Sequence, residues 1–223
     1  MRGAHTSERK FKAILKAFVS RTEANIAAKN NNLNRHSVEA IYSKIRQRIA
    51  LINKQEEIRN VAFAEVDESY FGAKRVRGKA GRGAKGKTIV FGLRSGNKVH
   101  AEKVPNCRRN TLIPIIVRCC AIDARIHSDG FKSYKCLKKM GYDHKVIKHS
   151  EEEFSKVIDG EKVHTNGIET AWSCCKTKLS RYRGIHPSRF DLYLAECVFR
   201  FNHRQEDIYM ILLSLFRADP IAN

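Results

Sequence analysis

The amino-acid sequence predicts an α/β protein in which helices precede and follow a mixed β-sheet. Three observations support this class. Apolar residues recur at helical spacing within residues 1–60, short β-rich runs alternate with helical segments between residues 61 and 147, and helical spacing returns from Asn166 onward. The 223 residues, 42% of them apolar, are enough for one sizeable core and a small appendage.

Residues 1–60 predict three helices. The first covers residues 8–19, the second follows a capping Thr22 and ends near Ala28, and the third begins near Ser37. A short helix, a turn and a longer helix are compatible with a helix-turn-helix. The segment has 13 basic and 5 acidic residues, and Arg46 is among the cations expected off the apolar stripe of the third helix. We predict a DNA-binding segment; the alternative is a three-helix packing unit with solvated charges.

Residues 61–223 predict a second domain with an RNase H-like fold and C-terminal helices. The predicted elements are strands over 61–67, 88–94 and 98–104, a helix over 111–120, a strand over 125–129, a helix over 130–140, a strand over 142–147, a polar loop over 148–163, and helices from Asn166, over 187–203 and over 206–217. This order is the one expected of an RNase H-like domain, although other mixed α/β folds share it.

The charge of the chain points to a polyanionic partner. Lys and Arg number 43 against 23 Asp and Glu, which gives a net charge of +20. Repulsion among so many positive charges would be offset by a polyanionic partner, and nucleic acid is the leading candidate. The alternative is a merely basic or ribosome-associated protein.

Cysteine usage and hydropathy point to a soluble intracellular protein. The seven cysteines are odd in number and include no Cys-x-x-Cys pair, so neither a disulfide framework nor a zinc ribbon is supported, and we expect buried reduced thiols. The start of the chain has no apolar signal core, and no stretch approaches the roughly 20 apolar residues that cross a bilayer. We expect a cytoplasmic protein, associated with the nucleoid in a bacterium or located in the nucleus of a eukaryote, with no membrane partner.

Three carboxylates are the most informative candidate residues. Asp67 ends the first predicted strand, Asp129 ends the fourth, and Glu169 lies near the start of the helix after the polar loop. The first and fourth strands are neighbours in an RNase H-like sheet, so Asp67 and Asp129 would converge and the helix would bring Glu169 against them. Each residue alone could be an ordinary turn or solvated helix position, but their joint placement in so basic a chain favours a catalytic site.

Clustered carboxylates repel one another unless cations join them, and oxygen ligands favour Mg²⁺ or Mn²⁺. Two such ions about 3.5–4 Å apart can activate an attacking oxygen and stabilise a leaving oxygen at a phosphodiester. The sequence therefore predicts a two-ion site at Asp67, Asp129 and Glu169.

Further residues on the helix that carries Glu169 are candidate auxiliaries. Lys176 lies two turns after Glu169 on nearly the same face and is expected to contact a DNA phosphate. Asn166 shares that face and could orient a ligand or act as one. Trp172 lies on the apolar stripe, where a core position is favoured over a base-stacking one.

Residues 72–87 form a glycine-rich basic loop with seven cations and no acid. Such a loop can hold a phosphate backbone, with a surface hairpin as the alternative. It is not a nucleotide-binding loop, because no Gly-Lys-Ser/Thr follows and it leads into a strand. Its candidate DNA contacts are Lys74, Arg75, Arg77, Lys79, Arg82 and Lys85.

Several ordered motifs resemble the insertion-sequence DDE transposases related to the eukaryotic Merlin elements. The resemblance covers roughly residues 61–217 and is densest at 164–169. Its motifs are Asp67-Glu68-Ser69-Tyr70-Phe71-Gly72, Arg77-Gly78-Lys79, Val90-Phe91-Gly92, Ile126-His127-Ser128-Asp129-Gly130, Gly141-Tyr142, His164-Thr165-Asn166-Gly167-Ile168-Glu169 with Trp172 and Lys176, Glu196, and Phe199-Arg200-Phe201-Asn202-His203-Arg204.

The resemblance implies an RNase H-like core with an Asp, Asp, Glu (or Asn) triad that binds divalent metal. Asp67 and Asp129 carry over directly, and for the third ligand we favour Glu169 over Asn166. The lysine that follows the third acid in the family matches Lys176. Related proteins often begin with a zinc ribbon, which is missing here.

The predicted function is a DNA transposase that cuts at the ends of its element and joins the 3′-OH ends to target DNA. Its expected partners are double-stranded DNA, both terminal inverted repeats and target, and further copies of the chain, because two ends must be synapsed. The alternatives are a structure-selective nuclease or resolvase on the same fold, and a non-catalytic DNA-binding protein from a decayed transposase.

Overall fold

A computed structural model describes residues 6–72, 87–147, 156–158, 161–182 and 184–220. The chain forms two compact units, one made of residues 1–52 and 203–223 and the other of residues 53–202. We describe each unit by itself. The division groups the last predicted helix with the N-terminal helices.

The first unit is built from helices that share a small aromatic core. It contains α1 (Glu8–Val19), α2 (Ala24–Asn30), most of α3 (Arg35–Gln55) and α7 (Ile208–Ala218). Ser7 caps α1, and Asp207 caps α7 by accepting from two backbone N–H groups. Phe11 meets Phe216 edge to face at 5.4 Å, and Phe18 meets Tyr42 at 5.2 Å. The three helices predicted in residues 1–60 are thus present.

The second unit is organised around a five-stranded mixed sheet in the order β3-β2-β1-β4-β5. The strands are β1 (Val61–Phe71), β2 (Thr88–Ser95), β3 (Lys98–Val104), β4 (Cys120–Asp129) and β5 (Asp143–Ile147). Strand β2 pairs antiparallel with both β1 and β3, and the β2–β3 hairpin turns at Gly96, where φ is +55°. Strand β4 pairs parallel with β1, and β5 pairs parallel with β4. This confirms the RNase H-like element order, in which β1 and β4 are neighbours.

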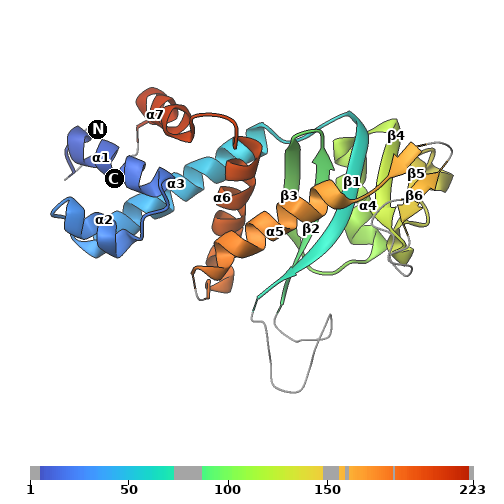
Figure 1. The fold of residues 1–223 in the computed structure, drawn as a ribbon, viewed down its shortest axis with the longest axis horizontal. Coiled ribbons are helices and arrows are strands. Elements are labelled where there is room, and N and C mark those ends of the chain that lie inside the picture. The colour runs from blue at the N-terminus through green and yellow to red at the C-terminus, as the bar shows by residue number, and fades with distance from the viewer. Residues whose placement is uncertain (1–5, 73–86, 148–155, 159–160, 183, 221–223) are drawn as a thin grey trace, which may run out of the picture. The chain divides into compact units, whose positions relative to one another are not determined.

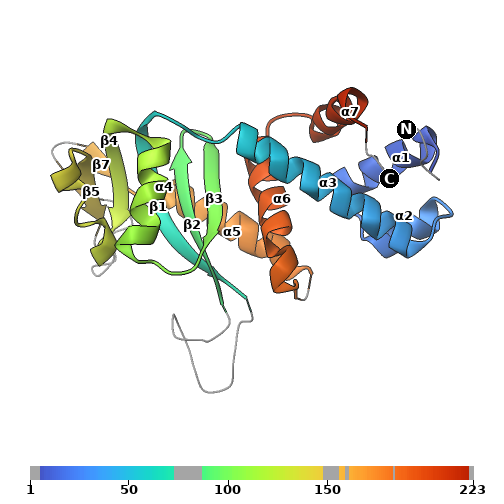
Figure 2. The same cartoon turned by 180° about the vertical axis from the view of Figure 1, so that it is seen from behind.

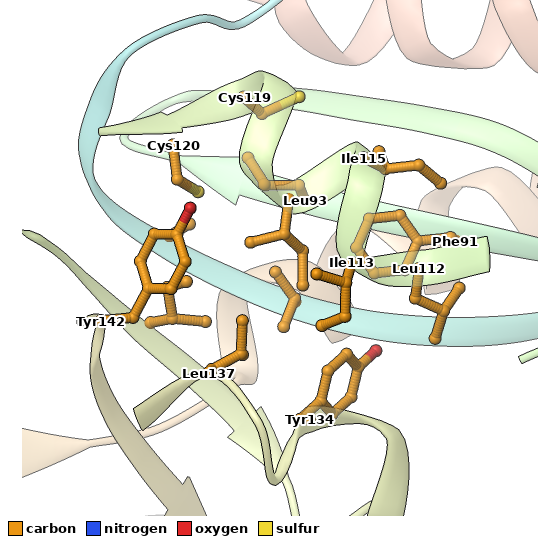
Figure 3. Packing of buried hydrophobic residues seen from close by; sticks show 14 of the residues in the cluster. Phe91, Leu93, Leu112, Ile113, Ile115, Cys119, Cys120, Tyr134, Leu137 and Tyr142 are labelled. Atoms are coloured by element: carbon orange, nitrogen blue, oxygen red, sulfur yellow. The ribbon is translucent and has the colours of Figure 1, made fainter. Parts of the chain in front are cut away.

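Helices cover both faces of this sheet, as Figures 1 and 2 show. Helix α4 (Arg109–Cys119) packs on one face, and α5 (Asn166–Ser180) with α6 (Phe190–Asn202) packs on the other. The α4 face buries Ala64 and Val66 of β1. Phe91 and Leu93 of β2 are buried in the same cluster, as Figure 3 shows. Because side chains alternate along a strand, Glu65 and Asp67 point to the α5 face.

Two predicted segments differ from the structure. The helix predicted over 130–140 is wrong: 3-10 turns at Lys132–Tyr134 and Lys138–Met140 take its place. The reason is tertiary, because the Ser133 hydroxyl donates to the Cys107 carbonyl at 2.6 Å and the Tyr134 hydroxyl donates to Glu68. The loop predicted over 148–163 contains a two-stranded ribbon, β6 (Lys156–Ile158) paired with β7 (Glu161–Val163).

All seven cysteines are free thiols, five of them buried, as expected. Among the described residues, no helix has the length and hydropathy needed to span a bilayer.

Candidate active site

Asp67 and Asp129 lie side by side on neighbouring parallel strands. Asp129 ends β4 as predicted, but the predicted strand end at Asp67 is wrong, because β1 continues to Phe71 through its pairing with β2. The β1–β4 pairing runs through Glu65 with His127 and Val66 with Ser128, so the next positions along the two strands are Asp67 and Asp129. Asp129 Oδ1 accepts from the backbone N–H of Phe131 at 3.0 Å, which fixes the carboxylate where β4 ends. The predicted convergence of these two acids is therefore present in the fold.

Glu169 reaches the same region from the first turn of α5, which packs against β1 and β2. The Thr165 hydroxyl donates to Glu169 Oε1 at 2.9 Å, and both residues lie at the start of the helix. The side chain of Glu169 is half-buried. The third predicted carboxylate thus lies on the element that faces Asp67.

Asp67 interacts electrostatically with both of the other acids. Burial, and next the negative charge of Asp129, raise the pKa of Asp67 to about 6, and Glu169 contributes in the same direction. Hydrogen bonds from the Glu68 backbone and the Trp172 indole oppose this rise only in part. A desolvated carboxylate among other carboxylates is an arrangement that a divalent cation would relieve. The chemistry of the three acids therefore fits Mg²⁺ or Mn²⁺, while their oxygens do not all lie within 4.8 Å of one another in this structure.

Trp172 is a core residue, as predicted, and it also contacts the site. Its side chain is 4% exposed, packs edge to face on Phe71, and its indole Nε1 donates to Asp67 Oδ2 at 3.0 Å. Sequence periodicity predicted that the ring lies in the core but gave no signal for the partner of its indole N–H. A buried indole N–H usually needs such a hydrogen-bond acceptor. Trp172 thus orients the first carboxylate.

Phenylalanine at position 172 is expected to lower DNA cleavage at neutral pH about 10-fold. The smaller ring keeps much of the packing but removes a hydrogen bond to the charged form of Asp67, so the pKa of Asp67 rises further and the pH–rate profile moves to higher pH. Phe190→Leu alters the same apolar cluster without touching Asp67 and is the control. A cleavage profile equal to that of wild type would refute this role.

The structure describes only some of the other predicted site residues. Lys176 is exposed, with its Nζ 5.9 Å from the Phe71 ring centre, and Asn166 is exposed at the first position of α5. The interaction of Asp67 with Glu169 is consistent with the preference for Glu169 over Asn166. The predicted contacts Lys74, Arg75, Arg77, Lys79, Arg82 and Lys85 lie outside the described residues.

The placement of Arg46 off the apolar stripe of α3 is wrong. The residue is 7% exposed and its guanidinium lies over the rings of Phe18 and Tyr42, at 5.4 and 5.9 Å. Arginine can stack on aromatic faces while its long stem is buried, which is why a charge-based helical wheel misplaces it. Arg46 therefore belongs to the core of the first unit, and we do not propose it as a DNA contact.

One further cluster of metal-type donors was not predicted from the sequence. Donor atoms of Glu57, His100 and Cys119 lie within 4.8 Å of one another, the only such trio found within the described part of the chain. Arg118 already occupies this cluster, with its Nε 2.9 Å from Glu57 and its Nη2 2.8 Å from Glu102. Burial raises the pKa of the Cys119 thiol to about 11. We interpret the cluster as an ion-pair network.

Comparison with known proteins identifies the family of this mixed α/β domain. The ISXO2-like transposase domain matches residues 62–202, and the chain belongs to this family. The matched region contains the whole mixed sheet, α4, α5 and α6.

One relative is an uncharacterized transposase-like protein from Haemophilus influenzae (strain ATCC 51907 / DSM 11121 / KW20 / Rd). It is 35% identical over 108 residues, which are 48% of this chain and 84% of the relative. Among solved structures, the catalytic core domain of BIV integrase matches with a TM-score of 0.41 and 16% identity, over 70% of this chain and 97% of that one. The Mos1 strand transfer complex matches with a TM-score of 0.32 and 10% identity, over 100% of this chain and 82% of that one.

Proposed function

We propose that this chain is a DDE transposase that cuts DNA at the ends of its element and joins the freed 3′-OH ends to target DNA. The observation that supports the proposal is the placement of Asp67 beside Asp129, with Glu169 on the facing helix, in a domain of a transposase family; burial, and next the charges of these two acids, raise the pKa of Asp67 to about 6. The family generally depends on divalent metal, and oxygen donors of this kind match that requirement.

Asp67, Asp129 and Glu169 would together hold two Mg²⁺ or Mn²⁺ ions. When bound, these ions would supply the Lewis acidity that activates an attacking oxygen and stabilises a leaving oxygen at the phosphodiester. The protein supplies orientation. The Trp172 indole fixes one oxygen of Asp67, the Phe131 backbone fixes one oxygen of Asp129, and the Thr165 hydroxyl fixes one oxygen of Glu169.

Lys176, exposed two turns beyond Glu169 on α5, would contact a phosphate of the bound DNA. The helical first unit and the basic loop over 72–87 would supply further contacts to the backbone of double-stranded DNA, and two copies would be needed to pair two ends.

A cleavage and joining assay tests this function. The full-length protein is incubated with Mn²⁺ and a duplex that carries the inverted repeats flanking its coding region, and cut and joined products are separated. Asp129→Asn and Glu169→Gln are expected to lower both products at least about 1,000-fold, equivalent to about 4 kcal/mol of activation free energy. Asp143→Asn changes an exposed aspartate on the neighbouring strand β5 and is the control.

The outcomes distinguish the competing functions. Products of cutting and joining that require both acids support a transposase. Cutting without joining would indicate a structure-selective nuclease or resolvase instead. DNA binding without any cutting would indicate a non-catalytic protein, and variants that cut as well as wild type would refute the triad assignment.

A further inference from the structure

A second carboxylate on β1, Glu65, is fully buried and joins three elements beside the site. Its side chain is 1% exposed. Oε1 accepts from Arg94 Nη1 on β2 at 2.8 Å, and Oε2 accepts from the backbone N–H of Ile168 in α5 at 2.8 Å. A buried charge is costly unless it is paired and hydrogen-bonded, and Glu65 meets both conditions.

The contact with Ile168 replaces an ordinary helix cap. The first N–H groups of a helix have no partner within the helix, and an N-cap side chain normally accepts from one of them. Thr165 stands at the N-cap of α5 but makes no side-chain capping bond, and its hydroxyl donates to Glu169. Glu65 takes that role from the sheet, and its negative charge also suits the positive end of the helix.

Gly167 makes room for this arrangement. A Cβ built at Gly167 would lie 1.8 Å from Arg94 Nη1 and 2.3 Å from its Cζ. The guanidinium therefore lies directly against the first turn of α5 while it pairs with Glu65. Any side chain at position 167 would displace Arg94 from Glu65 or lift the helix from the sheet.

These contacts connect the two segments that carry the proposed metal ligands. Glu65 lies two residues before Asp67 on the same face of β1, and its partner Ile168 immediately precedes Glu169. We infer that Glu65, Arg94 and Gly167 form a clamp that sets the position of Glu169 relative to Asp67 for divalent-metal binding. This inference rests on the proposed function. The clamp residues are positioning residues and hold no metal themselves.

Mn²⁺ titration of the full-length protein by calorimetry, without DNA, tests the clamp. Glu65→Gln and Gly167→Ala are each expected to weaken Mn²⁺ binding about 10- to 100-fold, as the loss of groups that orient metal ligands does. Gly167→Ala is the sharper variant, since it changes no charge and alanine within a helix is normally stabilising. Loss of negative charge near the metal therefore cannot explain its effect.

Glu196→Gln is the matched control, because Glu196 and Arg200 form another buried carboxylate–guanidinium pair, at 2.8 Å, within α6. It is expected to lower stability while leaving Mn²⁺ affinity unchanged. Hydrogen exchange gives a second readout: the Ile168 amide should lose protection in Glu65→Gln and keep it in Glu196→Gln. Cleavage at saturating Mn²⁺ should recover in Gly167→Ala.

The clamp is refuted if Glu65→Gln and Gly167→Ala both bind Mn²⁺ with the affinity of wild type. It is also refuted if these two variants and the control Glu196→Gln all weaken Mn²⁺ binding to the same extent. If wild type and Asp67→Asn show the same Mn²⁺ affinity, the proposed metal site itself fails, and the clamp's role fails with it. The two failures are therefore distinguished by the behaviour of Asp67→Asn.

Discussion

Asparagine in place of Asp67 is expected to abolish DNA cleavage and, without metal, to make the folded protein more stable. The pKa of Asp67 is raised from 3.8 to about 6 in the folded state, so its charged form is disfavoured there. A rise of this size corresponds to about 3 kcal/mol at neutral pH, and we expect Asp67→Asn to recover about 1–3 kcal/mol of it. The asparagine oxygen can still accept from the Trp172 indole.

The raised pKa of Asp67 determines how the stability difference between Asp67→Asn and wild type changes with pH. Below about pH 4 the residue is protonated in both folded and unfolded states, so Asp67→Asn and wild type should have similar stability. Between about pH 4 and pH 6 the unfolded state loses its proton first, and wild type becomes progressively less stable than the variant. Above the folded pKa the difference is constant.

Urea unfolding in the presence of a chelator, at acid and neutral pH, measures this difference. Added Mn²⁺ should stabilise wild type and leave Asp67→Asn unchanged, because only a folded state with an intact site gains binding energy. Asp191→Asn removes an exposed carboxylate that pairs with Lys103 and is the control. A variant that is less stable than wild type at neutral pH without metal would show that Asp67 is not held at an electrostatic cost.

Alanine in place of Gly92 is expected to destabilise the second unit and to disrupt the site. Gly92 lies in β2 opposite Asp67, and a Cβ there would lie 2.3 Å from Trp172 Cζ2 and 3.0 Å from Ile168 Cδ1. The indole cannot move aside freely, because it packs on Phe71 and donates to Asp67. Overpacking of this kind costs about 1–3 kcal/mol.

The sign of the Gly92 effect is the reverse of the usual one, since alanine normally suits a strand better than glycine does. Unfolding free energy and DNA cleavage should therefore both fall in Gly92→Ala. Gly130→Ala is the comparison, because a Cβ there meets only Val146 at 3.8 Å, an ordinary contact. Equal stability of Gly92→Ala and wild type would show that α5 does not depend on close approach at this point.

The order of elements was accessible from sequence because it rests on local patterns. Alternating β-branched runs predict strands wherever one face is buried, and Asp129 follows from the end of its strand, whereas β1 continues past Asp67 to Phe71. Helix α5 was also predictable from its repeating apolar residues. The family match over residues 62–202 agrees with the resemblance that these motifs carry.

The misplaced elements and the missed residues depend on contacts between distant segments. Residues 130–140 have helical spacing, but Ser133 and Tyr134 are bonded to other elements, and 3-10 turns satisfy those bonds. The sequence indicates only an ordinary strand residue at Glu65, whereas in the fold an N–H group of α5 donates to its carboxylate. The sequence indicates a solvated Arg46, whereas in the fold its guanidinium lies over the rings of Phe18 and Tyr42. A linear pattern contains no signal for such pairings.

Anomalous scattering from crystals grown with Mn²⁺ tests the central claim most directly, because it locates the ions themselves. We expect anomalous density between the carboxylates of Asp67, Asp129 and Glu169, and we expect it to be lost in Asp67→Asn. Density at Glu57, His100 and Cys119 instead, or three carboxylates each surrounded by water alone at saturating Mn²⁺, would contradict it.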